Sequence, residues 1–153
     1  MKTYKITKHN LDQNNYYIGK TDLSNFDGNI ESDENLGIIH FKFGIKSKFS
    51  ISVSAGSGIS ADLGISAGLG ISAGLGISAG RGISAGRGIS AGWGISAGLG
   101  ISAGWGISAG RGISAKLEIK CNLRIFAGIC NWRFPTKQEM EIRCGKFGSE
   151  GMI

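Results

Sequence analysis

Apolar residues recur every six positions from Val53 to Cys130, and the central units of this array read Gly-Ile-Ser-Ala-Gly-x. In the frame that begins at Val53, twelve of the thirteen lead positions are Ile, and the third position is Ala except at Cys121. A short fixed period is typical of solenoids and other stacked repeats. Only the fifth position, here called the corner residue, varies freely: Ser57, Leu63, Leu69, Leu75, Arg81, Arg87, Trp93, Leu99, Trp105, Arg111, Leu117, Leu123 and Ile129.

A period of six favours strands over helices. On a helix, six steps would scatter successive Ile side chains over three faces and leave no apolar stripe. On a strand, which has a period of two, Ile and Ala share one face and the Ser between them points the other way. The Gly-x-Gly that follows suits a corner, because Gly adopts turn conformations without steric cost. Each unit therefore predicts a short strand, Ile-Ser-Ala, followed by a corner.

Stacking these units buries Ile and Ala, and the sequence predicts an all-β, single-domain β-solenoid with capped ends. A triangular coil of three units and a flattened coil of two units both fit the period. The flattened coil suits a core of one Ile and one Ala per strand, since Ala permits close approach. We expect a polar segment and capping strand over 1–52, the solenoid over 53–130 and a C-terminal cap over 131–153.

The corner residues are expected to face solvent, because burying an unpaired Arg is very costly. A three-unit coil would bring Arg87 to Trp105 and Trp93 to Arg111. A two-unit coil would stack Trp93 over Trp105 and place Arg81 beside Trp93. Either arrangement predicts cation–π contacts along an edge. Exposed Trp beside Arg is typical of binding hot spots and base-stacking surfaces, so these five residues form a candidate partner-binding edge.

The segment before the array alternates apolar and polar residues from Ile39 to Val53. This pattern predicts one strand that runs into the first repeat, with one face buried. Its other face is a candidate basic face that carries His40, Lys42, Lys46 and Lys48.

The segment after the array is apolar until Pro135 stops it. Thr136 and Glu139 have the spacing of a capping box, which predicts a single helical turn, and 141–144 is expected to form a last strand. We expect Trp132, Phe134 and Phe147 to cap the core.

Three parts of the chain, residues 24–37, the Gly-Ile-x-Ala-Gly array and residues 123–133, together resemble a group of short, uncharacterised bacterial Gly-Ile-x-Ala-Gly hexapeptide-repeat proteins. The resemblance implies a β-solenoid and no established function. The array also resembles the left-handed β-helix hexapeptide family, but departs from its pattern. In that family a small residue lies two places before the aliphatic one, whereas here Ala lies two places after Ile.

Composition narrows the function classes. The 153 residues carry a net charge of +6, which suits either an anionic partner or simply a soluble surface. The three Cys lack C-x-x-C spacing and no secretory signal is visible, so we expect a cytoplasmic protein without metal or cofactor. A membrane span is disfavoured, because Ser and Gly dilute the segment from Val53 to Gly80 and three Arg follow in the same array.

These observations favour a non-enzymatic structural or interaction protein that uses a rigid solenoid as a scaffold. Its partner would be an anionic macromolecule, another protein or a second copy of the chain. Two alternatives stay open: an ice-binding protein that uses the ladder of outward Ser residues, and a nucleic-acid-binding protein that uses the basic Arg/Trp edge. An acyltransferase built around His40 is a more distant possibility, since left-handed hexapeptide enzymes use a His near a coil boundary.

Overall fold

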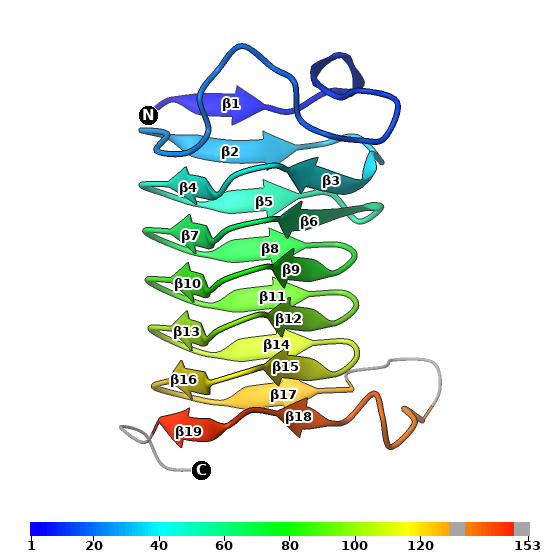
Figure 1. Cartoon of the computed structure of the whole chain (residues 1–153), viewed down its shortest axis with the longest axis vertical. Helices are drawn as coiled ribbons and strands as arrows, with labels where there is room; N and C mark the ends of the chain where they lie inside the picture. Colours follow the sequence, from blue (N-terminus) through cyan, green and yellow to red (C-terminus); the bar gives the residue numbers. More distant parts are fainter. Residues whose placement is uncertain (129–133, 149–153) are drawn as a thin grey trace.

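The computed structural model describes residues 1–128 and 134–148 and shows a β-solenoid, in which short parallel strands stack into three sheets along a rod (Figure 1). The predicted all-β fold is therefore confirmed. A seven-stranded sheet contains β1 (Thr3–Lys5), β2 (Asn29–Ser32), β5 (Ile51–Val53), β8 (Ile71–Ala73), β11 (Ile89–Ala91), β14 (Ile107–Ala109) and β17 (Ile125–Ala127).

The other two sheets have six strands each. One, whose outer face we call the β4 side, contains β4 (Ile45–Ser47), β7 (Ile65–Ala67), β10 (Ile83–Ala85), β13 (Ile101–Ala103), β16 (Glu118–Cys121) and β19 (Lys146–Gly148). The other, whose outer face we call the β3 side, contains β3 (Gly37–Phe41), β6 (Ser57–Ala61), β9 (Ile77–Ala79), β12 (Ile95–Ala97), β15 (Ile113–Ala115) and β18 (Ile142–Arg143).

One coil of the array takes three units. Ile83 pairs with Ile101 in β13, and Ile89 pairs with Ile107 in β14, so each residue lies beside the equivalent residue three units later. The flattened two-unit coil suggested by the small core is wrong. At every level, each of the three sides contributes one Ile to the core. Three Ile side chains fill a triangular cross-section, which a coil of only two strands could not enclose.

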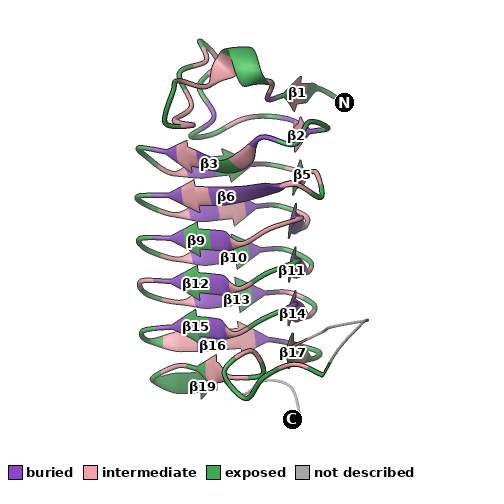
Figure 2. Cartoon of the chain, turned by 90° about the vertical axis from the view of Figure 1, so that its right-hand side faces the viewer, coloured by how far each residue is buried: buried purple, intermediate pink, exposed green. Residues whose placement is uncertain are grey.

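The core follows the predicted alternation. From Ile59 to Ile119 the lead Ile side chains are 0–1% exposed and the inward Ala residues 0–5% exposed, while the Ser between them lies on the outer surface. Figure 2 shows buried and exposed residues alternating along strands such as β9 and β12, with exposed residues gathered at the corners. Cys121 pairs with Ala103 and is buried, so it takes the place of the inward Ala.

The two glycines of a unit meet different neighbours. A Cβ on Gly86, the fourth residue of its unit, would lie 2.1 Å from the carbonyl oxygen of Gly68 in the preceding coil. A Cβ on Gly88, the sixth residue, would lie 3.4 Å from the carbonyl oxygen of Gly106, which is ordinary contact. Close approach of adjacent coils therefore favours Gly at the fourth position, which is Gly in most units, the exceptions being Asp62, Lys116 and Asn122.

The solenoid begins before Val53, and residues 39–53 are not one strand. They form parts of β3, β4 and β5, one on each side of the rod, because corners near Phe43 and Phe49 turn the chain between them. Val53 takes the place of the inward Ala and not of the lead Ile, which is Ile51. The next coil is slightly longer than a regular one, and it contains Ser57, which is buried. Its hydroxyl accepts a hydrogen bond from the Leu36 amide and donates to the Glu34 carbonyl.

Residues 1–36 close one end of the rod. β1 extends the seven-stranded sheet and is followed by a 3-10 helix over Lys8–Asn10. Ile6 and Leu23 are buried against the first coil. The Tyr17 hydroxyl lies 2.9 Å from the Tyr4 hydroxyl and 3.0 Å from the Thr21 carbonyl oxygen. Burial and the Tyr4 contact raise the pKa of Tyr17 well above its ordinary value.

The other end of the rod carries the predicted capping box. The Thr136 amide donates to Oε2 of Glu139 (2.9 Å), and the Glu139 amide donates to Oγ1 of Thr136 (3.3 Å) around one hydrogen-bonded turn. The expected last strand is present as β18, and β19 follows it. Phe134 is exposed, so the expectation that it caps the core is wrong. Phe147 pairs with the inward Ile119 and so lies at the inward position of β19, where it is 53% exposed. Trp132 lies outside the described residues. Among the described residues, no helix has the length and apolar character needed to cross a membrane.

Candidate functional site

The Arg and Trp corner residues face solvent, as the cost of burying Arg predicts, whereas Ser57 is buried. Arg81, Arg87 and Arg111 are exposed, and so are Trp93 and Trp105. Two glycines flank each of these five residues and turn the chain between adjacent sides.

The last Leu corner residues also face solvent. Leu117 is 54% exposed and Leu123 is 61% exposed. Ile129, the corner residue that follows, lies outside the described residues.

The three-unit register pairs Arg with Trp as that coil length predicts. The Arg87 guanidinium lies 5.2 Å from the centroid of the Trp105 ring, and the Arg111 guanidinium lies 4.8 Å from the Trp93 ring. Both pairs join neighbouring coils, since the Trp105 amide donates to the Arg87 carbonyl and the Arg111 amide to the Trp93 carbonyl. Arg111 also forms an ion pair with Glu139 (3.6 Å).

The five candidate residues do not lie along one edge. Three units per coil distribute the corner residues over three edges of the rod, each defined by its own backbone hydrogen bonds. The Trp105 corner comprises Leu69, Arg87, Trp105 and Leu123, the Trp93 corner comprises Leu75, Trp93 and Arg111, and the Arg81 corner comprises Leu63, Arg81, Leu99 and Leu117. The Trp105 and Trp93 corners flank the seven-stranded side, whereas Arg81 lies on the remaining corner away from both Trp residues.

A shallow trough of about 740 Å³ runs along the seven-stranded side. Its floor is formed by outward Ser residues and by the backbone of the Gly-Ile steps, and the Trp105 corner forms one wall. Arg124 and Phe126 line its far end, with Phe126 48% exposed. The trough therefore joins cationic and aromatic groups on one side of the rod.

Arg124 and Phe126 were missed by the reasoning from sequence. The three-unit register supplies the missing signal, because it pairs Phe126 with Ser108 and so places it at the outward position. Arg124 replaces the last glycine of its unit and lies two positions before Phe126.

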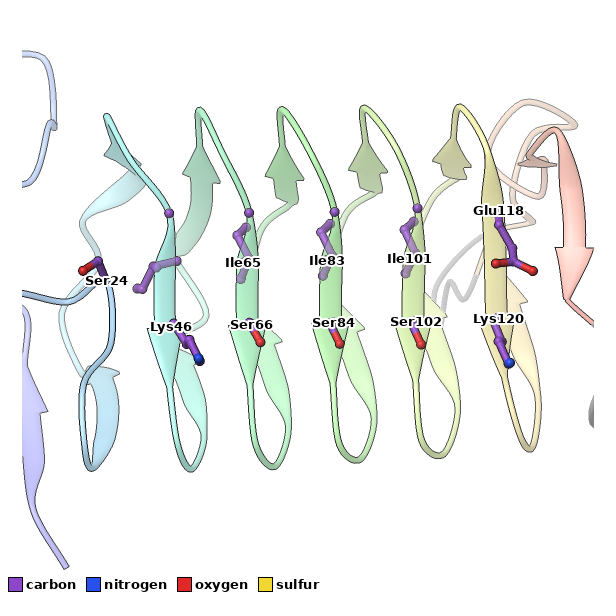
Figure 3. A pocket seen from close by; sticks show the side chains of 15 residues that line it. Ser24, Lys46, Ile65, Ser66, Ile83, Ser84, Ile101, Ser102, Glu118 and Lys120 are labelled. Atoms are coloured by element: carbon purple, nitrogen blue, oxygen red, sulfur yellow. The ribbon is translucent and has the colours of Figure 1, made fainter.

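The outward Ser residues form a single row on each side. On the β4 side, Ser66, Ser84 and Ser102 follow one another on successive strands between Lys46 and Lys120 (Figure 3). Adjacent rungs are separated by the strand spacing of about 4.8 Å. These rows give every side the same polar centre, so the sides differ in their corners and in the residues at their ends.

The four residues of the candidate basic face do not share a face. His40 lies on β3 and Lys46 on β4, while Lys42 and Lys48 occupy corners of the first coil. The His40 ring lies 5.2 Å from the Tyr16 ring, and the Lys42 ammonium lies 5.6 Å from the same ring. Lys48 forms an ion pair with Asp27. The turns that divide 39–53 into three strands separate these residues.

Within residues 1–128 and 134–148, no group of three or more His, Cys, Asp or Glu side chains is arranged to hold a metal ion. Cys121 and Cys144 are free thiols, and Cys130 lies outside the described residues. The geometry of the site is thus that of a surface and not of an enclosed pocket. Comparison of the chain with protein-family models, curated proteins and solved structures finds no match.

Proposed function

We propose that this protein is a non-enzymatic binding scaffold of the cytoplasm, whose solenoid holds a partner against the seven-stranded side. The observation that carries the proposal is the pair of Arg–Trp contacts that flank this side, Arg87 with Trp105 and Trp93 with Arg111. Large exposed aromatic rings beside guanidinium groups are the residue types that dominate binding energy at interfaces. The free thiols of Cys121 and Cys144 are compatible with a reducing compartment.

Rigidity supports the same function. The coils are tied together by parallel strand pairing in one register, so Arg87 and Trp105 are held on adjacent levels before any partner arrives. Preorganised groups lose less conformational entropy on binding, which favours affinity. The resemblance to bacterial hexapeptide-repeat proteins agrees with this architecture and adds no activity to it.

The test is quantitative capture from host lysate with three immobilised proteins. We expect the wild type to retain a saturable partner, and a variant with Arg87→Gln, Trp105→Leu and Trp93→Leu to lose it. Leu already occupies the corner position at Leu69 and Leu123, so these Trp changes suit the fold. A variant with Arg81→Gln and Leu99→Ser on the Arg81 corner is the matched control and should retain the partner. Equal retention by all three proteins would refute the proposal.

Ice binding is a second candidate, favoured by the in-register rows of Ser hydroxyls, such as the pairing of Ser84 with Ser102. It ranks second because each side carries a single row, which orders water along one direction only. The measurement is thermal hysteresis of the wild type against Ser84→Lys and Ser102→Lys. Activity in the wild type that both variants lose would favour ice binding over the scaffold.

A further inference from the structure

Beyond β2, whose Glu31 pairs with Ser52, the seven-stranded side differs from the other two sides in its charge. From β5 to β17, its strands and the Trp105 corner carry Arg87 and Arg124 and no carboxylate among residues that the structure fully describes. The other sides are mixed in charge. Glu118 lines the trough of the β4 side, and Glu141 lines that of the β3 side. A surface with cations and no acid is complementary to an anionic partner.

The same side also has exposed aromatic surface. Trp105 is 53% exposed and lies one coil from Phe126, whose strand pairs with β14. Both rings line the trough, together with Arg87. An uncharged partner would match the rings but leave the guanidinium groups unmatched, and a simple polyanion would match the guanidinium groups but not the rings.

One class of polymer satisfies both requirements. Single-stranded nucleic acid has phosphates for Arg87 and Arg124, and each of its bases has a planar face that can stack on an aromatic ring whatever the sequence. A duplex keeps its bases stacked inside and offers only its phosphates. The four strand steps from β5 to β17 span about 19 Å, which is room for roughly four to six nucleotides.

On these grounds we infer that the seven-stranded side binds single-stranded nucleic acid without sequence preference, with Arg87 and Arg124 on phosphates and Trp105 and Phe126 on bases. The inference rests on the proposed scaffold function and names the partner of the same surface. Two phosphate contacts set the salt dependence. The logarithm of affinity should fall with a slope of about −1.4 against the logarithm of salt concentration, or about sevenfold between 50 and 200 mM.

The experiment measures fluorescence anisotropy of a labelled oligothymidylate of about 20 nucleotides, with a duplex of equal length and inorganic polyphosphate as comparison probes. Four proteins are compared after their thermal unfolding has been shown to match. They are the wild type, Arg87→Gln with Arg124→Gln, Trp105→Leu, and a charge-matched control. The control changes Arg81→Gln with Lys120→Gln on the β4 side, and so removes the same charge from another surface.

We expect the wild type to bind the single strand about tenfold more tightly than the duplex. The Arg87/Arg124 variant should lose most of its salt dependence, and Trp105→Leu should bind about tenfold more weakly, as expected for one lost stacking contact. The charge-matched control should bind as the wild type does.

Three results would overturn the inference: equal weakening in the control and the Arg87/Arg124 variant, polyphosphate binding as tight as the single strand and unaffected by Trp105→Leu, or no binding to any probe. The lysate capture separates these failures from failure of the scaffold. A protein partner lost in the corner variant would leave the scaffold proposal standing while this inference falls.

Discussion

Replacing Gly86 by Ala should destabilise the solenoid, whereas replacing Gly88 two positions later should not. Neither glycine has a positive φ, so backbone conformation does not distinguish the two sites. The difference is steric. The new Cβ at position 86 would lie 2.1 Å from the Gly68 carbonyl oxygen, while the one at position 88 would lie 3.4 Å from the Gly106 carbonyl oxygen.

Relief of the contact at position 86 requires the two coils to separate by roughly 1 Å, so that the two atoms regain an ordinary non-bonded distance. That movement stretches the hydrogen bonds from the Gly86 amide to Ala67 and from the Arg87 amide to Leu69, both 3.0 Å long. Each is worth about 0.5–1.5 kcal/mol. With the accompanying loss of core packing, we expect Gly86→Ala to cost about 2–4 kcal/mol, or about 5–15 °C in Tm for a chain of this size.

The chain contains a natural precedent for this separation. Lys116 occupies the same position of its unit as Gly86, and its amide lies 3.3 Å from the Ala97 carbonyl oxygen. The corresponding distance is 3.0 Å at Gly86 and 2.9 Å at Gly98. Asp62 also occupies this position, and its amide lies 3.0 Å from the Phe41 carbonyl oxygen, so a side chain there is accompanied by a wider gap at Lys116 but not at Asp62.

Thermal unfolding followed by circular dichroism checks the prediction. Gly88→Ala should leave Tm unchanged or raise it slightly. Ala lowers the conformational entropy of the unfolded chain, which stabilises the fold by about 0.4–1 kcal/mol. Equal losses of Tm in the two variants, or no loss in Gly86→Ala, would refute the steric reasoning.

Four further predictions concern the core and the two ends. Ile89→Ala should cost about 2–5 kcal/mol, measured by thermal unfolding, because the Ile89 side chain is 1% exposed. Cys121→Ala restores the usual inward residue and should leave Tm nearly unchanged, whereas Cys121→Lys buries a charge and should lower Tm strongly. The raised pKa of Tyr17 keeps it neutral in the fold while the unfolded chain ionises near pH 10. Stability should therefore fall as the pH rises above 10, and Tyr17→Phe should reduce that slope in alkaline melts. Thr136→Ala removes one half of the capping box and should cost about 1 kcal/mol locally, seen as faster amide exchange at residue 139.

The architecture was predictable because it depends on a strict local pattern. Alternation within Ile-Ser-Ala fixes which side chains face inward, and the cost of burying Arg fixes the direction of the corner residues. The length of a coil was not fixed by that pattern, because two and three units both keep Ile on the inner face. The choice between two and three units depends on how many Ile side chains meet at one level of the rod. That number is a property of the whole cross-section and cannot be derived from the pattern of one strand.

The candidate site was predicted in its contacts but not in its layout. The cation–π pair of Arg87 with Trp105 followed from a three-unit register. Grouping Arg81 with them assumed that all corner residues lie along one edge, whereas a three-unit coil distributes them over three edges. The prediction of one strand over residues 39–53 was wrong for a related reason. A corner residue such as Phe43 has the same parity as the buried Ile39, so strict alternation continues through corners that turn the chain to another side.

The coil of three units also governs how such a chain tolerates changes in length. Insertion of three units within the array would lengthen the rod by one level and leave every downstream residue on its original side. Insertion of only one unit between Arg87 and Trp105 would rotate everything downstream by a third of a turn, with no change in the core, the period or the composition of any unit. Arg87 and Trp105 would then lie on different corners, so a single duplicated unit would leave the fold intact and dismantle the surface.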